Sequence, residues 1–118
     1  MKTILIILFT LIGTAIAGYF GYLYLLPNVT VINNSNVPIT SFVIQLPGSR
    51  LDFGGIEPGA HNTIYYKLNQ TDGSYQISTT LEGEKVLEKN CGYITNNELH
   101  KRVTVTLTQS QTLICAGA

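Results

Sequence analysis

The chain has 118 residues and a formal net charge of zero, with seven Lys plus Arg against seven Asp plus Glu. This length allows one ordinary domain. The even charge balance provides neither a basic surface for nucleic acid nor a polybasic patch for anionic lipid, so we expect no nucleic-acid partner.

An apolar segment without a charged side chain covers residues 3–26 and stops at Pro27. At 1.5 Å per residue, a helix over this segment is about 36 Å long, and a hydrocarbon core is about 30 Å thick. Tyr19, Tyr22 and Tyr24 stand where an outer interfacial aromatic belt falls. Residues 1–26 are therefore predicted to form a transmembrane anchor, and residues 27–118 an extracytoplasmic domain.

A cleaved signal peptide is the alternative interpretation of the same segment. Ala15-Ile16-Ala17 has the form of a signal-peptidase site, and Lys2 and the apolar run 4–12 supply the preceding regions. Cleavage after Ala17 would remove residues 1–17 and release a soluble periplasmic protein. Against cleavage, residues 18–26 are also apolar and would leave an exposed apolar tail.

The distribution of basic residues predicts the orientation of the span. Lys2 and the terminal amine precede it, and the next basic residue is Arg50. The positive-inside rule then places the N-terminus in the cytoplasm. We expect a single-pass protein of a bacterial inner membrane with its domain in the periplasm.

Small residues recur on one face of the expected helix, at Gly13, Ala17 and Gly21. This spacing allows two helix backbones to approach closely, which favours a helix dimer. Gly and Ala are also common in membrane spans for other reasons, so the oligomeric state stays open.

From Pro27 onward, short stretches alternate between apolar and polar residues, with turn residues between them. This pattern predicts seven or eight strands in a small antiparallel β-sandwich. The expected strands cover residues 29–32, 39–46, 51–53, 63–68, 75–81, 86–93, 102–108 and 111–115.

Alternation also predicts which side chains share a face of a strand. In the second strand we expect Thr40, Phe42, Ile44 and Leu46 on one side. In the fourth, Tyr65 points away from Ile64 and Tyr66, so Tyr65 is a candidate partner contact or a covered edge position.

Cys91 and Cys115 are the two cysteines of the chain. An even pair in an exported domain predicts one disulfide. If the protein stays in a reducing compartment, the pair would instead be two buried thiols.

No set of residues carries an evident chemistry. His61 and His100 lie far apart in sequence and fit no close-spaced zinc pattern. The serines lack a nucleophile-elbow context, and the acidic residues around the turn at 82–88 fit a solvated hairpin. We expect no catalytic, metal or cofactor site, and a small hydrolase remains a distant alternative.

Three turns resemble those of immunoglobulin-like and fibronectin-III-like modules: the Asn-rich turn 33–36, Ile56-Glu57-Pro58-Gly59, and Asp72-Gly73-Ser74-Tyr75. The resemblance covers about residues 28–115 and implies a β-sandwich. The chain lacks Trp, and Cys91-Gly92-Tyr93 reverses the Tyr-x-Cys order of antibody domains. It also resembles small bacterial envelope proteins, which implies no activity.

These observations predict a non-catalytic, membrane-anchored interaction or accessory module with another envelope protein as its possible partner. The alternative is a soluble periplasmic binder or inhibitor that is released by cleavage after Ala17.

Overall fold

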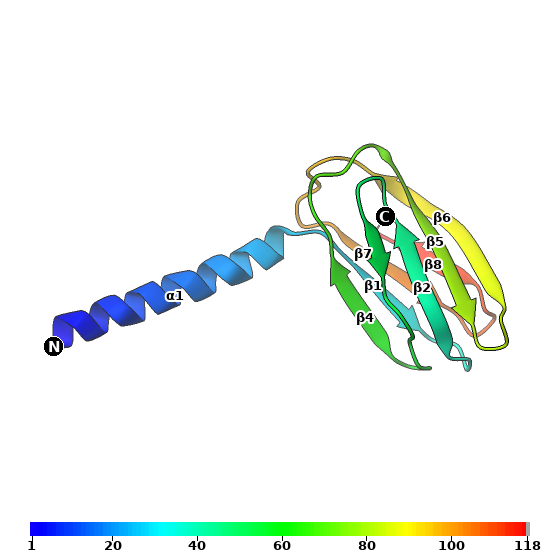
Figure 1. Ribbon diagram of the computed structural model, residues 1–118, viewed down its shortest axis with the longest axis horizontal. Coiled ribbons are helices and arrows are strands. Elements are labelled where there is room, and N and C mark those ends of the chain that lie inside the picture. Colours follow the sequence, from blue (N-terminus) through cyan, green and yellow to red (C-terminus); the bar gives the residue numbers. More distant parts are fainter. Residues whose placement is uncertain (118) are drawn as a thin grey trace.

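The computed structural model describes residues 1–117. It contains one helix, α1 (Lys2–Leu25), which extends away from a mostly β domain. The helix leaves one end of the domain and touches it only through its last turn (Figure 1). None of the helix side chains is buried.

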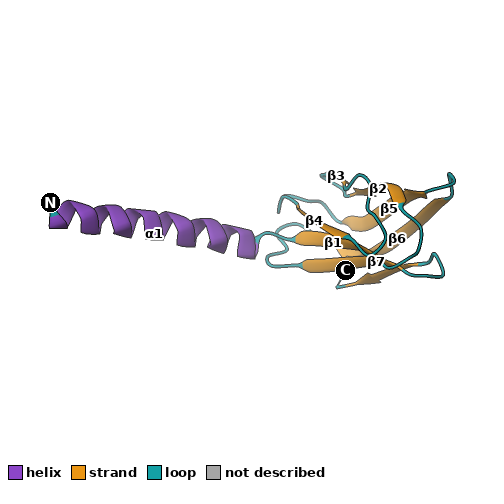
Figure 2. Cartoon of the chain, turned by 90° about the horizontal axis from the view of Figure 1, so that it is seen from below, coloured by secondary structure: helices purple, strands orange, loops and turns teal. Residues whose placement is uncertain are grey.

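The domain consists of eight strands: β1 (Asn28–Asn33), β2 (Ile39–Gln45), β3 (Arg50–Asp52), β4 (His61–Tyr65), β5 (Gly73–Leu81), β6 (Val86–Ile94), β7 (Arg102–Leu107) and β8 (Leu113–Ala116). They form two four-stranded sheets with the orders β4-β1-β7-β8 and β3-β2-β5-β6. Figure 2 shows the two sheets as separate layers.

The core lies between the sheets, where the alternating apolar side chains of both layers meet. Its buried members include Val29, Val31, Val103, Val105 and Leu107 from one sheet and Phe42, Ile44, Tyr75, Ile77 and Leu81 from the other. These are the positions that the period-two pattern selects, because successive side chains of a strand point to opposite faces.

A disulfide joins Cys91 of β6 to Cys115 of β8, as the sequence predicts. The two Cα atoms are 6.2 Å apart, and the bridge connects the two sheets. Beside it, the Lys89 ammonium donates a hydrogen bond of 2.9 Å to the Leu113 carbonyl oxygen. One edge of the sandwich is therefore closed by a covalent and a polar cross-link.

The prediction that all strand pairs are antiparallel is wrong for one pair. β1 and β7 run parallel, with Asn28 opposite Arg102 and Asn33 opposite Leu107. Both strands start at the end of the domain where the helix is attached, β1 directly after the helix and β7 after the β6–β7 loop. Their common starting point gives them the same direction.

The predicted face of the second strand is wrong at Thr40. The pairing of β2 with β5 shifts between Ile39 and Ser41, which is a β-bulge. Ile39 is buried there and Thr40 is exposed, with the Thr40 hydroxyl donating to the Thr80 carbonyl oxygen at 2.9 Å. Beyond the bulge, Phe42, Ile44 and Leu46 are buried as expected.

The fourth strand ends earlier than the alternation suggests, at Tyr65 instead of residue 68. Past its end, the Tyr66 amide donates to the Pro27 carbonyl oxygen at 3.1 Å, and Tyr66 is buried. The chain therefore turns across the end of the sandwich while it keeps the alternation of buried and exposed side chains.

Candidate functional site

The end of the domain that carries the helix is the most distinctive part of the structure. Two residues, Leu26 and Pro27, separate α1 from β1. The Asn28 amide donates to the Lys101 carbonyl oxygen at 3.0 Å. This bond joins the first residue of β1 to the residue that precedes β7. The helix is thus joined to the sandwich without a flexible linker.

The carbonyl oxygens at the end of α1 accept hydrogen bonds from His100 and Arg102, around the start of β7. The Arg102 guanidinium donates to the carbonyl oxygens of Leu26 at 2.6 Å and Tyr24 at 2.8 Å. The His100 amide donates to the Leu25 carbonyl oxygen at 2.7 Å. These carbonyls lack partners within the helix, and a cation next to them is favoured by the helix dipole.

His100 also contacts the helix through its ring. The ring stacks on the Tyr24 ring with 4.0 Å between centroids, and Nδ1 lies 2.6 Å from the Tyr24 carbonyl oxygen. His61 lies opposite Ile32, near the far end of β1. The structure therefore does not bring the two histidines together.

Both cysteines are in the disulfide, so neither can join a histidine as a metal ligand. Within residues 1–117, no group of three or more His, Cys, Asp or Glu side chains is arranged to hold a metal ion.

Behind the helix attachment lies a buried pair of tyrosines, Tyr66 and Tyr75. Their hydroxyl oxygens are 2.7 Å apart and their rings meet edge to face. Burial raises the pKa of both phenols above the ordinary value of 10.0, and the hydrogen bond between them raises the pKa of Tyr75 further. Both are therefore neutral hydrogen-bonding groups at physiological pH.

Lys101 connects this pair to the loop that holds the helix. Its ammonium lies 5.2 Å from the centre of the Tyr75 ring and 2.8 Å from the Glu98 carboxylate. A cation over an aromatic face and an ion pair both stabilise the position of the loop. The loop 95–101 is thus fastened to the core on one side and to the helix on the other.

Tyr65 is 43% exposed, whereas Tyr66 is buried, as the alternation predicts. Its backbone pairs with Asn28, which places it near the helix attachment. Tyr93 and Leu99 are also exposed in this part of the domain. A partner contact at Tyr65, and a helix dimer through Gly13, Ala17 and Gly21, stay predictions.

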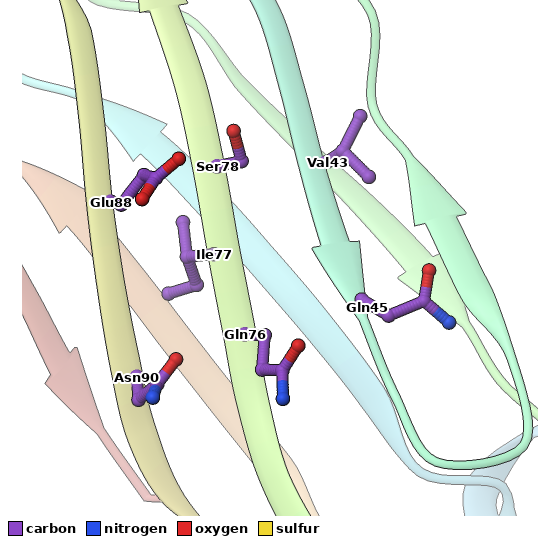
Figure 3. Close-up of a pocket in the computed structure, with 7 residues that line it drawn as sticks. All are labelled: Val43, Gln45, Gln76, Ile77, Ser78, Glu88 and Asn90. Atoms are coloured by element: carbon purple, nitrogen blue, oxygen red, sulfur yellow. The ribbon is translucent and has the colours of Figure 1, made fainter.

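A second feature is a shallow hollow of about 240 Å³ on the outer face of β2, β5 and β6. Figure 3 shows the residues that line it: Val43, Gln45, Gln76, Ser78, Glu88 and Asn90, together with Ile77, whose side chain belongs to the core. Ser78 and Glu88 are opposite each other on neighbouring strands, but neither histidine lines the hollow.

Sequence reasoning missed the roles of Lys101 and Arg102. The carbonyl oxygens that Arg102 contacts lie 76 and 78 residues earlier in the chain, at the end of the helix. Lys101 contacts the ring of Tyr75, which belongs to another strand. The one available signal was the absence of any basic or capping residue in the last turn of α1 itself. That absence left the helix end open to a cap from elsewhere.

No protein-family model matches the chain, and no curated protein matches it. Among solved structures, it is similar to one described as "NMR structure of the protein from Eubacterium rectale", with a TM-score of 0.52 and 9% sequence identity. The match covers 77% of this chain and 86% of that chain. At this identity the similarity shows the fold alone, and the resemblance to immunoglobulin-like modules stays a prediction.

Proposed function

We propose that the protein is a membrane-anchored, extracytoplasmic interaction or accessory module without catalytic activity. The observation that carries this proposal is a 24-residue apolar helix with no buried side chain, fused directly to the domain. In water such a helix would expose far more apolar surface than soluble monomers tolerate. In a bilayer, lipid chains cover the same side chains, and the helix satisfies its own backbone hydrogen bonds.

The polar groups within the helix fit this environment. The Thr10 hydroxyl donates to the Ile6 carbonyl oxygen and the Thr14 hydroxyl to the Thr10 carbonyl oxygen, each at 2.8 Å. In a hydrocarbon core every polar group needs a partner inside the protein. These two hydroxyls therefore need no water.

The geometry of the attachment supports a retained anchor over the released form. Cleavage after Ala17 would leave residues 18–25 as a helical stub of eight residues, and isolated helices of this length are marginal in water. Yet the domain directs His100 and Arg102 at the carbonyl oxygens of Tyr24, Leu25 and Leu26. These contacts have a clear role if a membrane helix precedes them.

Orientation with the domain in the periplasm follows from Lys2 and from the absence of basic residues until Arg50. Arg102 reaches the outer end of the helix only after the domain has folded. Arg102 is therefore not one of the basic residues near the span that set its orientation during membrane insertion.

Protease treatment of spheroplasts tests this topology. We expect the folded domain to resist digestion until the disulfide is reduced, and then to be degraded from outside while the cytoplasmic marker proteins stay intact. A domain that is digested only after the inner membrane is broken would contradict the periplasmic location.

Photo-crosslinking in living cells tests the interaction role. A photoreactive residue at position 65 is compared with one at position 86, since both native side chains are exposed. A discrete, reproducible adduct at position 65 alone would support a partner surface there. Identical patterns at both positions, or no adduct at either, would contradict it.

A further inference from the structure

The β6–β7 loop, residues 95–101, lies beside the outer end of the helix and presents Leu99 to solvent. Leu99 is 58% exposed although it is a large apolar residue, and its neighbour His100 stacks on Tyr24. In Figure 1 this loop lies at the end of the domain where the helix is attached. Its position raises the question of what covers Leu99 in the cell.

The length of α1 sets the depth of this loop relative to a bilayer. A hydrocarbon core of about 30 Å takes up about 20 helical residues, so a helix of 24 residues places a few residues in the two interfaces. With Lys2 at the inner interface, Tyr24 and Leu25 lie in the outer one. His100 contacts both residues, which places Leu99 at the same level.

The loop is rigid before any membrane contact is made. The Thr95 amide donates to a Glu98 carboxylate oxygen at 2.9 Å, and the Asn97 amide donates to the Leu68 carbonyl oxygen at 2.9 Å. The same Glu98 carboxylate pairs with Lys101, so the acidic charge next to Leu99 is compensated. Insertion of a side chain from a preorganised loop loses little conformational entropy.

The basic side chains near Leu99 are held within the protein. Lys101 and Arg102 lie two and three residues after Leu99, and their cationic groups bind the Glu98 carboxylate and the carbonyl oxygens at the helix end. They fasten the loop to the helix end, which keeps Leu99 at the level of Tyr24.

We propose that the β6–β7 loop is a second membrane contact, in which Leu99 inserts into the interfacial layer of the outer leaflet beside Tyr24. This inference rests on the proposed membrane anchor. With the helix and the loop both attached, the domain has a fixed orientation on the membrane and does not swivel. The β5–β6 hairpin then points away from the lipid.

Tryptophan fluorescence tests this directly, because the chain contains no tryptophan of its own. Full-length L99W is compared with full-length V86W in vesicles of phosphatidylethanolamine and phosphatidylglycerol. Val86 is a matched control, since it is 57% exposed and begins β6 at the opposite end of the domain. Thermal melts of both variants confirm that the domain is folded.

We expect the emission of L99W to lie at a shorter wavelength than that of V86W and to lose intensity when the vesicles contain lipids with brominated acyl chains. V86W should keep a water-like emission that these lipids leave unchanged. Equal emission from the two variants, without quenching, would overturn the proposal. Short-wavelength emission of L99W without quenching would also overturn it, in favour of contact with a second copy.

Flotation of the same vesicles separates failure of this inference from failure of the anchor. If the protein does not float with lipid, the membrane anchor itself is wrong and the loop has no membrane to contact. If the protein floats and L99W is not quenched, the anchor holds and the second contact is wrong.

Discussion

The helix and the β domain contain similar apolar residues, but these residues are exposed on the helix and buried in the domain. Phe9 of α1 is 74% exposed, whereas Phe42 of β2 is 0% exposed. In the domain, two sheets cover each other's apolar faces, but in the helix apolar residues occur on all sides and have no protein cover. Similar apolar residues thus form a buried core in the domain and an exposed surface, which we propose faces lipid, on the helix.

The largest effect should come from charges on the lipid-facing surface. We expect the double variant I12R/I16R to leave the membrane fraction in alkaline carbonate extraction, because each arginine near the centre of a span costs about 2.5–3.5 kcal/mol. The control Q76R/N90R places the same charges on the outer face of the domain. If I12R/I16R stays in the membrane fraction as fully as this control, the helix does not depend on lipid.

The two phenylalanines give a matched test of the comparison. F42A should lower the free energy of unfolding of the domain by about 3–5 kcal/mol, because it leaves a cavity between the sheets. F9A should leave this value unchanged, since Phe9 contacts nothing in the domain. Denaturant titrations of both variants in detergent measure the difference, and equal losses would contradict separate roles for the two regions.

Removal of the disulfide should lower the free energy of unfolding almost as much as F42A does. The bridge closes a loop with a sequence separation of 24 residues. The loop-closure entropy of such a loop predicts that the free energy of unfolding of C91S/C115S is about 3–4 kcal/mol lower than that of the parent. The measurement is denaturant unfolding of this variant against the oxidised parent, and a negligible loss would mean that the bridge adds little to the two packed sheets.

The buried tyrosine pair should give a smaller, pH-dependent effect. Because the pKa of both phenols is raised in the folded state, their contribution is complete below about pH 10 and is lost as the pH rises through their folded-state pKa. Y75F leaves the Tyr66 hydroxyl buried without its partner, which costs about 1–3 kcal/mol at neutral pH.

Melting temperatures of the parent, Y75F and the exposed control Y93F between pH 7 and pH 11 test this point. The parent and Y93F should lose stability steeply above pH 10, and Y75F less steeply. Parallel curves for all three proteins would show that the pair does not control alkaline unfolding.

The smallest effect concerns the connection between the two regions. R102M removes the guanidinium from the helix end but keeps an apolar stem, and loss of a cation at a helix C-terminus costs about 0.3–1 kcal/mol. Amide hydrogen exchange should become faster at Leu26 and Asn28. R50M, at an exposed site in β3, should leave it unchanged. Equal exchange in both variants would mean that the cap does not hold the junction.

Strands such as β5 and β7 could be predicted because one face of each is buried, so the side-chain period is visible in the sequence. Ile64, Tyr65 and Tyr66 follow this rule even past the end of β4. The bulge at Thr40 could not be predicted, because it depends on how β2 pairs with a strand almost 40 residues away. The parallel pair β1–β7 depends in the same way on where distant segments meet.

The candidate site was less predictable than the fold for a related reason. The exposure of Tyr65 was predicted by alternation within one strand, which is a local signal. Arg102, His100 and Lys101 act on the helix end and on the tyrosine pair only after the sheets have assembled. Local patterns therefore identify the elements, and the contacts between them require the three-dimensional structure.

The proposed membrane anchor requires that the helix stays attached to the domain, and intact mass spectrometry of the protein purified from the envelope tests this most directly. We expect a single species of about 12.9 kDa that contains residues 1–118. A mature protein that begins at Gly18 would contradict the membrane anchor and favour the released, soluble binder.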